Sequence, residues 1–92
     1  MKKEADWDDI SFIVRSKHRK KILELLDTPK TPTQLTREIK LHFNAVSRTL
    51  VELQDKGFVK CLNPSQKLAR FYKISEKGKR LLKKLGGLKG IS

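Results

Sequence analysis

The fold is decided by residues 31–50, TPTQLTREIKLHFNAVSRTL. Thr31 is a favourable N-cap, Pro32 is tolerated at the first helical position, and Gln34 stands where a capping box needs its reciprocal acceptor. Leu35 and Ile39 recur at helical spacing and face inward. This pattern predicts a short helix that begins at Pro32.

A second helix is expected from about His42 to Lys56. Its buried side carries Val46, Leu50 and Leu53, and Gly57 supplies a left-handed residue that stops it. Two helices joined by a tight turn, the second presenting small polar and basic side chains outward, are the layout of a DNA-reading helix-turn-helix.

Helical spacing also predicts two segments before this pair. The first occupies residues 7–14, and the second follows a cap at Ser16 and ends at residues 27–29, DTP. Their apolar residues are Trp7, Ile10, Ile13 and Val14 in the first and Ile22, Leu25 and Leu26 in the second.

The pattern changes from helical to extended after Gly57. Residues 59–62 and 70–74 are rich in β-branched and aromatic types, and the polar residues 63–67 turn the chain between them, which predicts a β-hairpin. Ser75 caps a last helix, which we expect to end at the glycine pair 86–87. The predicted fold class is therefore mainly α with a small β-hairpin (α+β), a winged helix-turn-helix.

One domain accounts for all 92 residues, because a chain of this length buries one modest core. Its expected parts are an N-terminal helix and dimerisation segment (1–15), a winged core (16–75), a C-terminal helix (76–86) and a flexible tail (87–92). Neither a membrane span nor a signal peptide is evident, and a single cysteine, Cys61, is consistent with a reducing compartment, so we expect a cytoplasmic protein.

The formal net charge is +12, and it is unevenly distributed. After Asp55 the only acid is Glu76, whereas basic residues continue to the end of the chain. Such a field suits a polyanion. Two other readings are a basic surface kept for solubility and an anionic membrane partner. We rank the membrane low, because the basic residues are spread over several elements instead of lining one amphipathic helix.

Residues 46–50, VSRTL, followed by residues 52–59, ELQDKGFV, resemble the recognition-helix motif of the ArsR and MarR superfamilies of winged helix-turn-helix regulators. Residues 16–26 and 70–78 are similar to segments of compact archaeal regulators of this type, so that the resemblance covers residues 16–82. There are two departures from the pattern: Lys40 stands where a turn glycine is common, and Thr36 stands where a small alanine usually packs.

A helical wheel places Asn44 and Arg48 on the outer face of the second helix of the pair, with Ser47 beside them. Asn bonds bidentately to adenine and Arg to guanine in the major groove, whereas Ser47 is better suited to a phosphate or a water. We therefore expect double-stranded DNA to be read by Asn44 and Arg48.

Backbone contacts are expected from five further residues. Thr33 and Gln34 open a helix whose N-terminal N–H groups suit phosphate, and His42 is either an imperfect N-cap or a phosphate donor. Lys67 and Arg70 flank the expected wing tip, where basic side chains approach the minor groove or its phosphates. An ordinary surface lysine is nearly as good a description of Lys67, whereas Arg70 matches the wing arginine of the family that the sequence resembles. Phe43 is expected to pack against the preceding helix.

No enzyme chemistry, cofactor or metal site is indicated. Cys61, His18 and His42 have no ligand-like spacing, and the paired cysteines of metal-sensing ArsR proteins are missing from the recognition helix. Asp8 and Asp9 are adjacent, so they point in different directions from a helix, and no Gly-rich phosphate loop is present.

The favoured function is a sequence-specific transcriptional regulator. The alternatives are an architectural nucleic-acid-binding protein with little sequence preference and, more weakly, a protein-interaction winged helix. We also expect a homodimer, because apolar residues at both ends of the chain exceed what the small core needs. They are Trp7, Ile10, Phe12 and Ile13 at the start and Leu81, Leu82, Leu85 and Leu88 at the end. Trp7 is expected in the core or at an interface.

Overall fold

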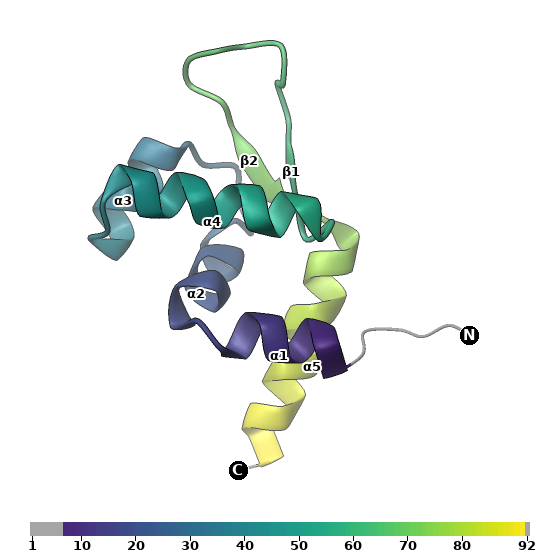
Figure 1. Ribbon diagram of the computed structural model, residues 1–92. Helices are drawn as coiled ribbons and strands as arrows, with labels where there is room; N and C mark the ends of the chain where they lie inside the picture. The colour runs from purple at the N-terminus through teal and green to yellow at the C-terminus, as the bar shows by residue number, and fades with distance from the viewer. Residues whose placement is uncertain (1–6, 92) are drawn as a thin grey trace.

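A computed structural model describes the backbone of residues 7–91 and the side chains of residues 7–85 (Figure 1). The elements in this part of the chain are α1 (Trp7–Val14), α2 (Lys17–Leu25), α3 (Pro32–Ile39), α4 (Phe43–Asp55), β1 (Val59–Cys61), β2 (Tyr72–Ile74) and α5 (Glu76–Ile91). This order confirms the predicted winged helix-turn-helix. No helix in the described part is long and apolar enough to cross a membrane.

One hydrophobic core lies between the helices and the base of the hairpin. Val46, Leu50 and Leu53 face it from α4, as the helical wheel predicts, and Phe58 folds back onto the end of that helix with its N–H bonded to the Leu53 carbonyl at 2.9 Å. The other buried apolar residues are Ile13, Ile22, Leu23, Leu26, Leu35, Val59, Tyr72, Ile74, Leu81 and Leu85. Because its inner face is anchored here, α4 keeps a fixed rotation about its axis.

The capping box before α3 is present. The Gln34 N–H donates to the Thr31 hydroxyl at 3.2 Å, and the Thr31 N–H donates to the Gln34 side-chain oxygen at 2.8 Å. At the other end of α3, Lys40 has a φ of 64°, so a lysine occupies the left-handed position that usually takes glycine. The Thr36 hydroxyl donates a hydrogen bond to the Thr33 carbonyl at 2.6 Å. Both departures from the family pattern are therefore accommodated, Lys40 at the C-cap and Thr36 within α3.

The hairpin strands are shorter than predicted, and they pair antiparallel with Val59 opposite Ile74 and Cys61 opposite Tyr72. One more bond, from the Leu62 N–H to the Phe71 carbonyl at 2.8 Å, closes the base of the loop 62–71, which we call the wing. Lys30 forms an isolated bridge to Tyr72. The hairpin is thereby fixed to the segment that leads into α3.

Helix α5 begins as predicted but ends later. The Ser75 hydroxyl accepts from the Gly78 N–H at 3.1 Å and caps the helix. The helix then continues through Gly86 and Gly87 to Ile91, so the predicted end at residue 86 and the predicted flexible tail 87–92 are wrong for residues 87–91. A helical glycine costs only about 1 kcal/mol relative to alanine, too little to oblige a helix to stop. Ser92 lies outside the described residues.

Helix α5 runs from the base of the hairpin to the end of the molecule away from the wing, and it packs there against α1 (Figure 1). Ile13, Leu81 and Leu85 are buried in the protein's own core, and Ile10, Phe12 and Leu82 pack against it. The expectation that these residues exceed the needs of that core is therefore wrong for most of them. Trp7 is 74% exposed, so it does not pack in the core. Residues 1–6 and the side chain of Leu88 lie outside the described part.

Arg19 joins α1 to α4. Its guanidinium stacks 3.9 Å from the centroid of the Phe12 ring, donates to the Phe12 carbonyl at 2.6 Å, and pairs with Glu52 at 3.2 Å. The pair is half-buried, which favours a defined geometry over a mobile surface contact. The N-terminal helix is thus connected directly to the helix that carries Asn44 and Arg48.

Candidate nucleic-acid interface

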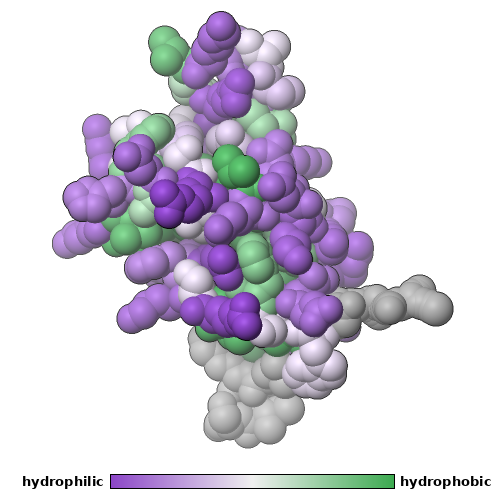
Figure 2. Space-filling view, viewed as in Figure 1, coloured by the Kyte–Doolittle hydropathy of each residue, from purple (hydrophilic) through white to green (hydrophobic). Residues whose placement is uncertain are grey.

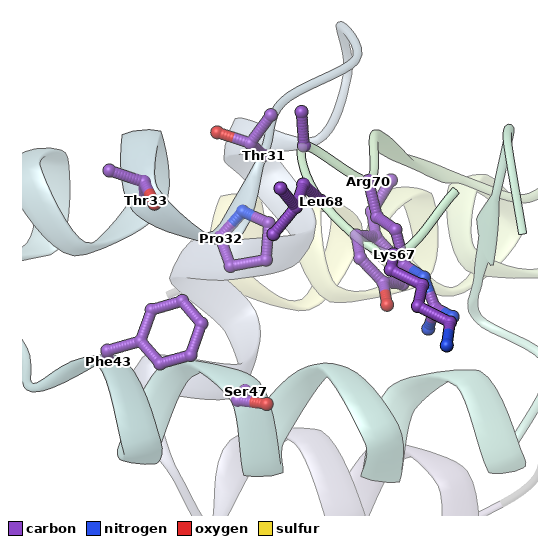
Figure 3. Close-up of a pocket in the computed structure, with 10 residues that line it drawn as sticks. Thr31, Pro32, Thr33, Phe43, Ser47, Lys67, Leu68 and Arg70 are labelled. Carbon is purple, nitrogen blue, oxygen red and sulfur yellow. The ribbon is translucent and has the colours of Figure 1, made fainter.

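An open groove of about 560 Å³ lies where α3, α4 and the wing meet (Figure 3). It is lined by Thr31, Pro32 and Thr33 from the start of α3, Phe43 and Ser47 from α4, and Lys67, Leu68, Ala69, Arg70 and Tyr72 from the hairpin. None of these side chains is acidic. The groove therefore brings together four of the predicted site residues, namely Thr33, Ser47, Lys67 and Arg70.

Asn44 and Arg48 are exposed one turn apart on the outer face of α4. The buried Val46 and Leu50 on the opposite side hold them in that orientation. Among the side chains that the structure describes, no carboxylate lies within 4.0 Å of the Arg48 guanidinium. Both side chains are thus available to an external partner, as major-groove readout requires.

Phe43 and Ser47 occupy the face of α4 that turns toward α3 and the wing. In Figure 3 the Phe43 ring is directed toward Pro32, and both residues line the groove. Phe43 remains 53% exposed, so its packing against the preceding helix is only partial. Ser47 is half-buried on the floor of the groove.

Two helix N-termini open beside this groove. The Gln34 N–H is already donated to Thr31, so this predicted phosphate ligand is engaged in the cap, and the N–H of Thr33 is the better-placed donor at the start of α3. His42 is the N-cap residue of α4, is exposed, and makes no side-chain capping bond. The first N–H groups of α4 therefore keep their capacity to bind an anion.

The side chains that the wing exposes to solvent differ from those that the sequence predicts. The Arg70 Nε donates to the Gln66 carbonyl at 2.6 Å, which ties this side chain to the wing itself. Lys67 is exposed beside it. The residue that protrudes is Leu68, which is 82% exposed and was not among the predicted site residues. Its only signal in the sequence is its place as a lone large apolar residue in a polar turn.

Much of the positive charge in the described part of the chain is not neutralised by an acidic partner. In residues 7–85 the ion pairs are Arg19–Glu52, Lys20–Glu24, Lys30–Glu38 and Lys79–Glu76, which leave most of the basic side chains without an acidic partner. Lys60 and Lys73 stand directly opposite each other on the paired strands, and this juxtaposition of like charges destabilises the hairpin. Hydrophilic side chains accordingly dominate the face drawn in Figure 2. This surface complements a polyanion.

Within the described residues no group of three His, Cys, Asp or Glu side chains is arranged to hold a metal ion. Cys61 is half-buried, and its sulfur lies 3.8 Å from the side-chain oxygen of Asn63. Asn63 itself also receives the Phe71 N–H at 2.8 Å. The thiol is thus part of the hydrogen bonding at the base of the wing.

Comparison with known proteins identifies a family. The model described as "HVO_A0261 N-terminal domain" matches residues 7–89, which is most of the chain. A search of curated protein sequences finds no match.

Solved structures with the same fold include transcriptional regulators. The regulator BldR from Sulfolobus solfataricus has a TM-score of 0.74 and 18% identity, over 91% of this chain and 63% of BldR. A mutant of MarR from E. coli complexed with operator DNA has a TM-score of 0.73 and 24% identity, over 86% of this chain and 59% of that one. A Lactococcus lactis ZitR mutant in complex with DNA has a TM-score of 0.66 and 20% identity, over 78% and 51%. The chain thus spans between half and two thirds of the length of these structures.

Proposed function

The chain belongs to the HVO_A0261 N-terminal domain family, and on that footing we propose that it is a sequence-specific transcriptional regulator that binds double-stranded DNA in the cytoplasm. The observation that carries the proposal is the pair Asn44 and Arg48. Both are exposed on the outer face of α4, beside a groove whose charged side chains, Lys67 and Arg70, are cations. Two of the regulators that share this fold were solved with DNA bound.

In this proposal α4 lies in the major groove and the wing follows the adjacent backbone and minor groove. Asn44 bonds to adenine and Arg48 to guanine, so these two side chains carry sequence information. Ser47, His42 and the Thr33 N–H contact phosphates and set the register of α4. Occupation of promoter DNA would then exclude or recruit the polymerase.

Selection of bound duplexes from a random DNA pool tests the function. At near-physiological salt a regulator enriches one motif, because base contacts separate its preferred site from the rest of the pool. A pool that is retained without any enriched motif would instead indicate an architectural protein. A pool that is not retained at low salt would exclude a role on DNA.

Base-reading and backbone-contacting residues should separate on mutation. Arg48→Ala and Asn44→Ala are each expected to cost about 1–3 kcal/mol on the selected motif and much less on unselected DNA. Arg70→Ala should weaken binding to both DNAs similarly, because backbone contacts are independent of sequence. The measurement is fluorescence anisotropy with the two duplexes at one salt concentration. Equal losses on both DNAs for Arg48→Ala would contradict a base-reading role.

We also propose a homodimer formed through α1 and α5. These helices lie away from the wing, so that pairing them leaves both copies of α4 free to reach DNA, and half-sites about one helical turn (~34 Å) apart would match such a dimer. Trp7 and Val14 are exposed on α1 by 74% and 56% and provide apolar surface for the contact.

Sedimentation at micromolar concentration should therefore detect a dimer. Trp7→Ser is expected to shift the equilibrium toward monomer, because it removes the largest exposed apolar side chain of α1. The control is Phe71→Ser, which removes a partly exposed aromatic ring from the hairpin at the other end. A monomer at every concentration, with or without Trp7, would be incompatible with the proposed dimer.

A further inference from the structure

Leu68 is the most exposed of the large apolar side chains that the structure describes, at 82%. Moving a leucine side chain out of water lowers the free energy, so its exposure at this position is unfavourable in the isolated protein. The side chain stands at the end of a hairpin that carries cations and no acid between Asp55 and Glu76. Apolar surface surrounded by positive charge fits a polyanion that also offers apolar surface.

The backbone around Leu68 is held in place. The Asn63 side chain receives the Phe71 N–H at 2.8 Å and donates to the Ala69 carbonyl at 3.2 Å, which joins the two sides of the wing. The Gln66 N–H bonds to the Asn63 carbonyl at 3.0 Å. Ala69, directly after Leu68, has a φ of 54°, a left-handed conformation that is uncommon for alanine. Leu68 therefore projects from a constrained tip.

The basic residues at the tip lie beside this leucine. Arg70 is bonded back to the Gln66 carbonyl at 2.6 Å, and both Arg70 and Lys67 line the groove next to α4 (Figure 3). Their positions suit the phosphates on the sides of a DNA groove. Leu68, which is 82% exposed, is then an apolar side chain that stands between these two cations in the sequence.

We propose that Leu68 is an apolar wedge that the wing inserts into the DNA minor groove, where it contacts deoxyribose and the edge of a base step and partly unstacks that step. This inference rests on the proposed function and adds a second source of sequence preference to it. Apolar side chains that enter the minor groove open easily deformed pyrimidine–purine steps. The wing should accordingly favour such steps without a hydrogen bond to any base.

Two duplexes of equal length and composition separate a wedge from a charged reader. One carries alternating thymine and adenine, and the other an uninterrupted run of adenines on one strand. The flexible TA steps of the first favour a wedge, whereas the narrow minor groove of the second favours an arginine or lysine. We expect the protein to bind the alternating duplex about fivefold more tightly, which is the effect of partly burying one leucine.

Leu68→Ala should abolish this preference and leave the salt dependence unchanged, because no phosphate contact is lost. The matched control is Leu62→Ala, which shortens a leucine that is 46% exposed at the base of the same wing and should keep the preference. In the same experiment, 2-aminopurine at a TA step should brighten on binding of the wild-type protein and of Leu62→Ala, and not of Leu68→Ala. Melting curves of the three proteins confirm that each is folded.

The possible outcomes are distinct. Binding to both duplexes without any effect of Leu68→Ala overturns the wedge and leaves the proposed function intact. A preference for the adenine run that disappears in Lys67→Ala or Arg70→Ala also overturns the wedge, since a cation would then be the reader. Failure of the wild-type protein to bind either duplex at low salt overturns the proposed function together with the wedge.

Discussion

Raising the salt concentration from about 50 to about 200 mM is expected to weaken DNA binding by about four orders of magnitude. A dimer that neutralises on the order of eight phosphates gives a slope of log K against log salt of about −7, because each contact releases condensed counterions. The net charge of +12 and the scarcity of acidic partners for the basic side chains of residues 7–85 motivate this value. Fluorescence anisotropy over this salt range measures it.

Two lysine variants show which charges are responsible. Lys67→Ala should flatten the slope by about 2, because each of the two wings loses one phosphate contact. Lys20→Ala is the control, since Lys20 already pairs with Glu24 at 3.7 Å on α2. An overall slope shallower than about −3 would mean that most of the basic surface has no role on DNA.

Gly78→Ala should destabilise the protein by about 3 kcal/mol, which lowers the melting temperature by about 15 °C for a domain of this size. A Cβ at this position would stand 2.3 Å from the Phe58 carbonyl oxygen and 2.7 Å from Ile74. The carbonyl cannot easily move, because it accepts the Ser75 N–H at 2.9 Å and connects the end of α4 to the start of α5.

The sign of this effect is diagnostic. At an open helical position, alanine in place of glycine stabilises by about 1 kcal/mol, so a clash must overcome that gain before any loss is seen. Lys79→Ala, one residue further along and exposed, should change stability by less than about 0.5 kcal/mol. Thermal unfolding followed by circular dichroism measures both variants. A Gly78→Ala protein as stable as the wild type would contradict the close packing of α5 against Phe58.

Local interactions explain why so much of the fold could be predicted. The capping box of Thr31 and Gln34 and the left-handed Gly57 act within a few residues of themselves, so sequence spacing is enough to place them. The end of α5 could not be placed in this way. Glycine only weakens a helix, and Leu81 and Leu85 hold α5 against the core just before the glycine pair.

The candidate site could also be predicted only in the part that local interactions determine. The outward direction of Asn44 and Arg48 follows from the periodicity of a single helix. The engagement of Arg70 with Gln66 and the projection of Leu68 depend on how the wing folds, and no periodic pattern describes an irregular loop. The exposure of Trp7 likewise depends on tertiary packing, because spacing identifies an apolar stripe without showing which members reach the core.

The facing lysines of the hairpin, Lys60 and Lys73, imply that salt acts on folding and on binding in opposite directions. Their repulsion, and that of the other unpaired cations, opposes the compact state of the free protein. Ions screen this repulsion over about 10 Å at 0.1 M, so added salt should strengthen the free fold while it releases DNA. We therefore expect protein that high salt elutes from DNA to be folded. We also expect bound DNA to stabilise the domain most at low salt, where ions screen the repulsion least.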